Sequence, residues 1–434
     1  MSNWKVFNIN EISLAESLEF VVDNRGKTVP LAETSEKIIA LIATNCISND
    51  HLYPQKLNLR YVSQEIFDNW FRAHPKSGDI ILTNKGSNNG EVCLVPENID
   101  FCIAQDMVAV RADKKKIDPL YLFAALRSKT VQRRIKYLNV DAVIPHFKKT
   151  DFNKLLIPLP ERKYQEFIGE LYFNLSSKIE NLRRQNDTLE AIAQTLFKHW
   201  FIDFEFPNAD GKPYKSSGGA MVRSALGYIP EAWSVGKLGQ YLNIKHGYAF
   251  KGEYITTEVT EKILLTPVNF KIGGGFNDSK YKYYSADDYL NEYVLRRKDL
   301  AITMTDLSKE GDSLGYPAFI PDIKGKVFLH NQRIGKVENN NIDKTFLYFL
   351  LCRREYRSHI LGTSSGSTVR HTSPSRICEY SFVIPDFELI DKFSALATAT
   401  IDKILINFNQ IQTLTKTRDA ILPKLMSGQL RVDM

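Results

Sequence analysis

The fold of this chain is decided by one stretch, ERKYQEFIGELYFNLSSKIENLRRQNDTLEAIAQTLFKHW, which spans Glu161 to Trp200. Mostly apolar residues recur in it every seven positions, in two rows set three residues apart. One row is Ile168, Leu175, Leu182, Leu189 and Leu196, and the other is Tyr172, Ile179, Asn186, Ala193 and Trp200. A heptad sustained in this way is typical of a coiled coil. Because Pro158 and Pro160 stand just before it, the stretch predicts one long helix from about Glu161 to Trp200.

A second helix of the same kind is predicted over residues 389–426. Its rows are Ile404, Ile411 and Leu425, and Thr400, Asn407, Leu414 and Ile421. Arg418 interrupts the first row, and Pro423 is expected to distort the last turn. Each helix is the only comparable partner for the other, so we expect them to pair antiparallel. The alternative is that each packs on the chain's own globular domains. Asn186 and Asn407 on the seam either fix the register or stay exposed.

The chain also repeats itself once. Glu36-Lys37-Ile38 recurs as Glu261-Lys262-Ile263, and the same offset of 225 places His146 on His371. Small gaps then align GDIILT, residues 78–83, with KDLAIT, residues 298–303. A period of this length indicates two whole domains rather than a solenoid.

Each copy starts with short β-branched and aromatic runs, continues into a helical patch and ends in a long helix. The predicted fold class is therefore α+β, with two strand-rich domains joined by two long antiparallel coiled-coil helices in a pseudo-two-fold internal repeat. At 1.5 Å per residue, a helix of about 40 residues spans roughly 60 Å, which would hold the domains at opposite ends of a rod. The expected segments are domain 1 at 1–158, a central long helix at 159–204, a Gly-, Ser- and Pro-rich linker at 205–232, domain 2 at 233–385 and a C-terminal long helix at 386–434.

Composition places the chain among ordinary globular proteins. Of its 434 residues 43% are hydrophobic and 25% charged, and the net charge of +7 is compatible with a polyanionic partner without requiring one. The five cysteines lack metal-ligand or redox spacing, which favours a reducing compartment. No apolar run approaches the ~18 residues of a membrane helix, and the N-terminus lacks a signal-peptide pattern, so we expect a cytoplasmic protein.

A search for catalytic motifs finds almost nothing. The sequence contains no GxxxxGK[ST] phosphate loop, no HExxH and no Cys/His cluster. Asp386 and Glu388 could begin a nuclease-like acidic pair, but no Glu-x-Lys follows, and helix capping by Asp386 explains them better. We therefore expect no catalytic residue, no metal site and no cofactor in this chain.

The loops of the strand-rich halves are different, because they combine amide, hydroxyl and cationic side chains that suit base edges and phosphates. The candidate DNA-binding residues of the first copy are Lys85, Ser87, Asn88, Asn89, Gln105, His146, Lys148 and Lys149. Those of the second copy are Lys245, His246, Tyr248, Ser308, Lys309, Gln332, Arg333, Ser367, Thr368, Arg370 and His371.

Four stretches resemble the specificity subunit of type I restriction-modification systems. TLEAIAQTLFKHWFIDFEFPN (188–208) is similar to the end of that family's central conserved region, and MVRSALGYIPEAWSVGKL (221–238) to the entry of its second recognition domain. TRDAILPKLMSGQLRV (417–432) resembles its C-terminal signature, and GSTVRHTSPSRI (366–377) the Gly-Ser-Thr loop that closes a target-recognition domain. The first copy departs there, since DAVIPHFKKTDF (141–152) lacks Gly-Ser-Thr.

The resemblance implies a non-catalytic subunit in antiviral defence, in which each recognition domain binds one half of a bipartite double-stranded DNA target. The paired helices would set the spacing and dock methyltransferase (modification) subunits, two of them expected. Those partners would use S-adenosylmethionine to methylate adenine, and motor-nuclease (restriction) subunits would use ATP and Mg²⁺.

Two other classes of protein stay open at this point. One is a coiled-coil interaction scaffold with no nucleic-acid role, which duplex DNA binding with steep salt dependence would exclude. The other is a metal-dependent nuclease hidden in the strand-rich domains, which DNA cleavage by the purified chain alone would support. The target sequence cannot be read from these residues.

Overall fold

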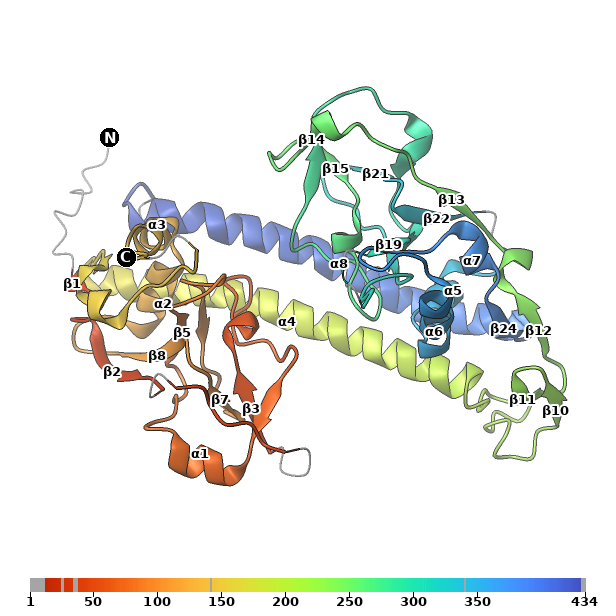
Figure 1. Ribbon diagram of the computed structural model, residues 1–434, viewed down its shortest axis with the longest axis horizontal. Coiled ribbons are helices and arrows are strands. Elements are labelled where there is room, and N and C mark those ends of the chain that lie inside the picture. The colour runs from red at the N-terminus through yellow and green to blue at the C-terminus, as the bar shows by residue number, and fades with distance from the viewer. Residues whose placement is uncertain are drawn as a thin grey trace. The chain divides into compact units, whose positions relative to one another are not determined.

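Two helices of 40 residues each, α4 (Arg162–Phe201) and α8 (Phe387–Met426), run through the computed structural model (Figure 1). The structure describes residues 12–430 except 25–26, 34–37, 141–142, 307, 309 and 339–340. Both long helices begin and end within two residues of the predicted bounds. α8 continues through Pro423 to Met426, so this proline does not end the helix.

The chain divides into two units, each of which contains half of each long helix. The first unit consists of residues 1–182 and 410–434, and the second of residues 183–409. In the first unit, Ile179 and Leu182 of α4 share a small apolar cluster with Ile411 of α8. In the second unit, the Nδ2 atom of Asn407 donates to Oδ1 of Asn186 across 2.8 Å. A second contact in each unit gives the direction, since Arg418 lies over Tyr172 in the first unit and Phe393 contacts Phe197 in the second. Within each unit, higher numbers on α4 meet lower numbers on α8, which confirms antiparallel pairing.

Arg418 does not break the seam, although it stands in an apolar row. Its guanidinium lies over the ring of Tyr172, 5.4 Å from the centroid, and donates to the carboxylate of Asp419 across 2.9 Å. The aliphatic part of a long cationic side chain packs well on apolar surface, so the residue is buried with its charge paired.

The first unit is built on an antiparallel sheet in the order β2-β8-β5-β6 and a smaller sheet in the order β4-β3-β7, whose pair β3 and β7 is parallel. The strands are β1 (Ile12–Ser13), β2 (Leu18–Val22), β3 (Ile39–Ile42), β4 (Arg60–Val62), β5 (Ile80–Thr83), β6 (Val92–Leu94), β7 (Phe101–Ile103), β8 (Met107–Ala112) and β9 (Leu156–Ile157). The helices are α1 (Gln64–Trp70), α2 (Pro119–Arg127) and α3 (Lys129–Tyr137), with short 3-10 turns η1 (Thr44–Cys46) and η2 (Lys149–Lys154).

The core of the first unit lies between the larger sheet, α2 and the long helices. Ile80 and Val108 of the sheet share it with Tyr172 of α4 and with Leu422 of α8, and α2 is buried from Tyr121 to Arg127. A continuous apolar run of this kind is what a helix needs when it is covered on several sides.

The second unit repeats this plan. Its main sheet has the order β13-β22-β18-β20, and its second sheet has the order β14-β16-β15-β21-β17, with β15 and β21 parallel. The strands are β10 (Met221–Ser224), β11 (Gly227–Pro230), β12 (Ser234–Lys237), β13 (Asn243–His246), β14 (Ile255–Thr256), β15 (Lys262–Leu264), β16 (Lys282–Tyr284), β17 (Val294–Leu295), β18 (Leu300–Thr303), β19 (Thr305–Asp306), β20 (Pro317–Phe319), β21 (Val327–Leu329), β22 (Ile334–Glu338), β23 (Arg370–His371) and β24 (Ser381–Ile384). The helices are α5 (Lys344–Leu351), α6 (Arg354–Thr363) and α7 (Pro374–Cys378), with 3-10 turns η3 (Leu238–Gln240), η4 (Gly252–Tyr254), η5 (Pro267–Asn269) and η6 (Asn291–Tyr293).

The repeat holds at the level of single turns. Gly90 N donates to Thr83 O and Gly315 N to Thr303 O, both across 2.8 Å, and both glycines have positive φ. A Cβ atom would meet Ile135 at Gly90 and Ile360 at Gly315, and these isoleucines are themselves equivalent in the repeat. Because left-handed backbone under a bulky side chain suits only glycine, one turn has been kept twice in this chain.

The predicted linker is an ordered segment. Residues 221–230 form the β10–β11 hairpin, and the ring of Phe206 stacks on Tyr214 and on Trp233, with centroids 4.6 and 5.0 Å apart. Its Gly- and Ser-rich composition reflects tight turns rather than a free chain.

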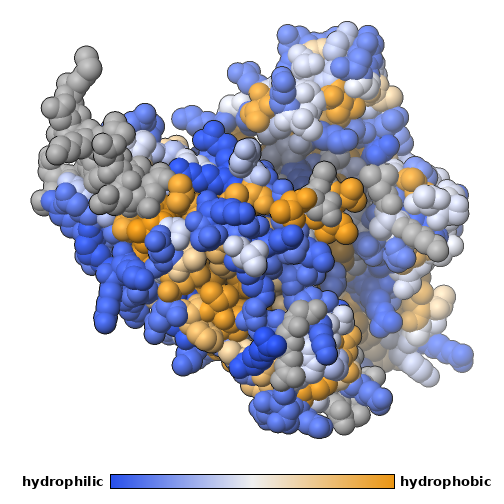
Figure 2. All heavy atoms as spheres, turned by 60° about the vertical axis from the view of Figure 1, so that its left-hand side comes forward, coloured by the Kyte–Doolittle hydropathy of each residue, from blue (hydrophilic) through white to orange (hydrophobic). Residues whose placement is uncertain are grey.

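The surface is mixed. The face presented in Figure 2 is mostly hydrophilic, with apolar side chains exposed between the charged ones. Across the part of the chain that the structure describes, no helix combines the length and the apolar character needed to cross a membrane.

Candidate nucleic-acid interface

The predicted residues of the first unit gather where the strands of the larger sheet end. Four segments, residues 23–24, 103–106, 83–85 and 146–149, lie side by side through hydrogen bonds, and we call this row the first edge. Asn24 Nδ2 donates to Ile103 O across 2.7 Å, Asn84 N to Asp106 O across 3.0 Å, and Phe147 N to Asn84 O across 2.9 Å. Lys85 pairs with His146 as an isolated β-bridge.

The second unit has the same row. Here the segments are residues 246–248, 330–334, 303–306 and 370–372, with Ser365 beyond them, and we call the row the second edge. Gly247 N donates to Ile334 O across 3.2 Å, Met304 N to Arg333 O across 2.8 Å, and Thr372 N to Met304 O across 2.9 Å. The last two bonds are the counterparts of those made by Asn84 and Phe147. The alignment of His146 with His371 is therefore correct in space, because β23 pairs His371 with Thr305 as His146 pairs with Lys85.

On the first edge, the structure brings Lys85, Gln105, His146, Lys148 and Lys149 together, and Lys149 forms an ion pair with Asp23. Ser87 is exposed at the tip of the adjacent loop. Asn88 and Asn89 face the protein instead. Asn88 Nδ2 donates to Thr44 O across 3.0 Å, and Asn89 Nδ2 donates to Asn139 Oδ1 across 2.5 Å. These two amides shape the loop, and their donors are used within the protein.

On the second edge, His246, Gln332, Arg333 and His371 are exposed, and the ring of Tyr248 lies against Tyr293 with centroids 5.2 Å apart. Lys245 is held within the domain, since its Nζ donates to Glu292 Oε2 across 2.8 Å, and this hydrogen bond raises the pKa of the ammonium. Lys309 lies outside the described residues.

The loop that carries the Gly-Ser-Thr sequence closes the second edge. Gly366 has φ of 93°, and a Cβ atom there would lie 2.0 Å from Val369 O, so the tight turn requires this glycine. Ser367 and Thr368 are exposed at its tip, while Arg370 is half-buried and donates to Ser364 Oγ across 3.1 Å. The first copy lacks Gly-Ser-Thr, and residues 141–142 of its corresponding loop lie outside the described part of the chain.

The turn after β19 is organised by a buried carboxylate. Asp306 Oδ1 accepts from Ser308 N across 2.7 Å, and Oδ2 accepts from the backbone N and from Oγ of Ser313, the latter across 2.7 Å. Burial favours the neutral acid, but the hydrogen bonds from the two serines outweigh it and hold the pKa of Asp306 below its usual value. In this turn Gly315 follows Thr303 by 12 positions, whereas in its counterpart Gly90 follows Thr83 by 7.

Sequence reasoning missed several residues that shape both edges. Thr305 Oγ1 lies 3.2 Å from His371 Nδ1, and Arg376 donates to Ser365 Oγ across 3.0 Å. Asn24 and Asp23 begin the first edge. The repeat aligns the ends of β5 and β18, and this alignment could have predicted that the neighbouring residues belong to the edges.

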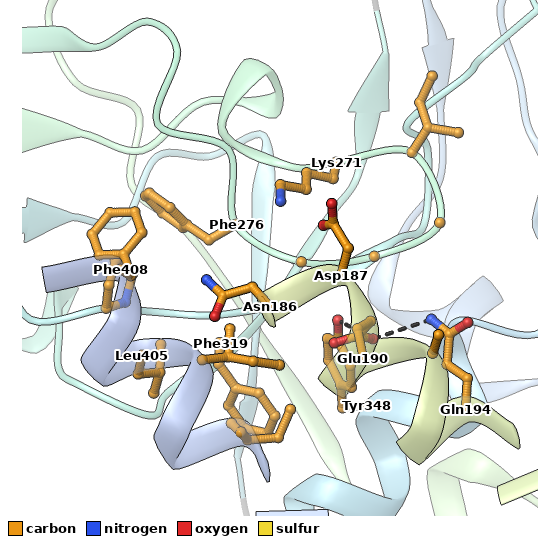
Figure 3. Close-up of a pocket in the computed structure, with 18 residues that line it drawn as sticks. Asn186, Asp187, Glu190, Gln194, Lys271, Phe276, Phe319, Tyr348, Leu405 and Phe408 are labelled. Atoms are coloured by element: carbon orange, nitrogen blue, oxygen red, sulfur yellow. Dashed lines mark hydrogen bonds between the residues drawn. The ribbon is translucent and has the colours of Figure 1, made fainter. Parts of the chain in front are cut away.

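A separate recess of about 390 Å³ lies between α4, α8 and the Gly273–Gly275 loop of the second unit (Figure 3). In it, Glu190 Oε1 accepts from the Tyr348 hydroxyl across 2.9 Å and from Gln194 Nε2 across 3.1 Å, and burial raises the pKa of Glu190. No residue of the second edge lines it. The bond from Tyr348 attaches α5 to α4, and the bond from Gln194 lies within α4, so both support the domain. Within the described residues, no cluster of His, Cys, Asp and Glu could hold a metal ion.

Comparison with known proteins agrees with this geometry. Residues 1–191 match the family model "type I restriction modification DNA specificity domain". The type I restriction enzyme MjaIX specificity subunit of Methanocaldococcus jannaschii is 28% identical over 72% of this chain and 69% of its own length. The HindI specificity subunit of Haemophilus influenzae is 22% identical over 99% of this chain and 100% of its own length.

The chain is similar to type I restriction-modification specificity subunits over most of its length. The crystal structure of such an S subunit from M. genitalium covers 99% of this chain with a TM-score of 0.54 at 18% identity, so the two share their fold. The match to a DNA specificity domain gives residues 1–191 a role in DNA recognition.

Proposed function

We propose that the chain is a specificity subunit in which each edge reads one half of a bipartite duplex DNA target. The observation that carries the proposal is the duplicated row of backbone hydrogen bonds. Asn84 N to Asp106 O in the first edge and Met304 N to Arg333 O in the second form the same scaffold. Beside those bonds a glutamine is kept, as Gln105 and Gln332. Other side chains differ, since Asn84 corresponds to Met304, Lys85 to Thr305 and Asp106 to Arg333. A constant backbone with different amide and cationic side chains suits the reading of two different base sequences.

The long helices are proposed to set the distance between the half-sites and to dock methyltransferase subunits, two per chain. Three large aliphatic side chains stand exposed on the second-unit portions of these helices, namely Ile192 (58%), Leu396 (56%) and Ile406 (45%). In the proposed complex, the methyltransferase subunits would cover these side chains. In this proposal, residues 1–158 and 233–385 are the recognition domains, 159–204 and 386–434 the helices, and 205–232 the connection.

The chain is proposed to hold no cofactor. S-adenosylmethionine would be bound by the methyltransferase subunits, and ATP and Mg²⁺ by motor-nuclease subunits. The purified chain alone should neither transfer a labelled methyl group from S-adenosylmethionine to DNA nor cut DNA.

A domain exchange tests the proposal. Residues 233–385 are replaced by the matching domain of another specificity subunit, and the host's methylome is sequenced with the original and the exchanged chain. The methylated DNA sequence should change in one half-site, while the other half-site and the distance between the two stay the same. A motif altered in both halves, or in neither, would remove the assignment of one reader to each domain.

A further inference from the structure

Helix α3 of the first unit carries three cations on one exposed face. Lys129, Arg133 and Lys136 are separated by four and three residues, which places them on one side of a helix, and all three are exposed. Val131 and Ile135 are buried on the other side, so the helix presents a fixed face to solvent. The Ser128 hydroxyl, which accepts from Val131 N across 3.3 Å, caps the start of the helix.

This cationic face borders the first edge. Gln132 Nε2 donates to Gly90 O across 2.8 Å, and Gly90 closes the loop that begins at Lys85. At about 100° per residue, Lys136 and Lys129 lie roughly 40° and 60° around the helix from Gln132. The helix then leads through Asn139, whose Oδ1 accepts from Asn89, to Val140, whose N donates to His146 O across 3.3 Å. The cations therefore flank the row of candidate base-reading residues.

The face carries no acid of its own, although the Glu91 carboxylate, which follows Gly90, interacts electrostatically with Lys136. α3 contains no Asp or Glu, and none of the three cations forms an ion pair with a carboxylate in the described part of the chain. Three neighbouring cations repel one another, which makes an unpaired face of this kind unfavourable for the isolated fold and complementary to a polyanion.

The repeat provides an internal comparison. Ile135 and Ile360 occupy the same place beneath Gly90 and Gly315, which aligns α3 with α6. The residues of α6 that correspond to Lys129, Arg133 and Lys136 are Arg354, Ser358 and Leu361, and Glu355 adds an acid. The fold therefore does not require a cationic face at this helix, and only the first domain carries one.

We propose that Lys129, Arg133 and Lys136 bind backbone phosphates of the DNA beside the half-site that the first edge reads. This inference rests on the proposed function and adds an anchor outside the reading edge, present in one domain only. Phosphate contacts fix the position of a protein on the duplex and carry no base selectivity. Each contact releases counterions and contributes about 0.9 to the slope of log affinity against log salt.

The test replaces all three by glutamine (K129Q, R133Q and K136Q) in the full chain. The matched control is K114Q, K115Q and K116Q, which removes the same charge from the exposed segment at the far end of β8. Binding is measured by fluorescence anisotropy over a range of salt, with a labelled duplex carrying the site methylated in the host and with one whose half-sites are scrambled. Thermal melting confirms that both variants fold.

The α3 variant should bind both duplexes more weakly by the same factor, with a salt slope shallower by about 2–3, while the ratio between the duplexes is unchanged. The control should keep most of the original slope. Equal losses in both variants would show a general charge effect and overturn the inference, as would an α3 variant that binds like the original chain. If the original chain binds neither duplex at low salt, the proposed function fails as well.

Discussion

Replacing Asp306 by asparagine should open the turn after β19 and impair one half of the target. The carboxylate uses both oxygens, one for Ser308 N and the other for Ser313 N and Oγ. An asparagine amide has only one acceptor oxygen, so its NH₂ group must face at least one of these donors. A hydrogen bond to a charged group contributes about 1.5–3 kcal/mol, and the variant loses at least one such bond and the charge that strengthens the others.

This loss is local, because the turn is not part of the sheet core. We expect hydrogen exchange at Ser308 and Ser313 to accelerate roughly 10- to 150-fold, as about 1.5–3 kcal/mol implies. The control is D312N, which removes the same charge from an exposed residue of the same turn. Methylation by the complex containing D306N should lose selectivity in the half read by the second domain and keep it in the other half. If D306N and D312N exchange at the same rate and methylate the same motif, the assignment of this turn to recognition is wrong.

Acid should weaken the turn for the same reason. Because the folded pKa of Asp306 is depressed, its contribution is complete above the ordinary carboxyl pKa of about 3.9 and is lost as the pH falls through the lower folded value.

Three further predictions concern stability. His330 is fully buried, and burial lowers its pKa to about 4. The second unit should therefore lose about 3 kcal/mol of unfolding free energy as the pH falls from about 6.5 to 4, and urea titrations of H330Q should show a weaker dependence on pH. Asn407 is fully buried with its Oδ1 unpaired, so the double variant N186L/N407L, which removes both amides, should be as stable as the original chain or more stable by about 1 kcal/mol, whereas a lower melting temperature would make the Asn186–Asn407 pair a net stabiliser. G315A should destabilise by about 2–4 kcal/mol, because the new Cβ lies 2.9 Å from Ile360 at a positive φ, whereas G362A in α6 meets nothing and should be neutral or slightly stabilising.

The long helices were predictable almost to the residue because heptad spacing and the flanking prolines are local signals that tertiary packing reinforces. The repeat was predictable because matches kept their order along the chain. The connection at 205–232 was not, since Gly and Ser serve tight turns and free chains equally, and only the packing of Phe206 between Tyr214 and Trp233 separates the two.

The edges were predictable in place but not in detail. Asn88 and Asn89 have the chemistry of base readers, yet their amides turn inward to Thr44 and Asn139, because side-chain direction depends on a loop conformation that residue type does not reveal. Lys245 forms a hydrogen bond with Glu292, which is 47 residues away in the sequence, and no local sequence pattern predicts such a pair. The cations of α3 were visible in the sequence, but their place beside the first edge follows from Gln132 and Gly90.

The division of the chain has a consequence for its synthesis. The second unit is one continuous segment, residues 183–409, whereas the first needs the last part of the chain, from Gln410 onward. Leu422 and Leu425 cover the first unit's core beside Ile168 and Tyr172, and Ile411 covers Ile179. Until the ribosome has made the C-terminal segment, those apolar surfaces are exposed to water and to chaperones, even though the strands of the domain have already emerged from the exit tunnel. The domain made first is completed last, so premature termination near the C-terminus damages the N-terminal reader and leaves the second one whole.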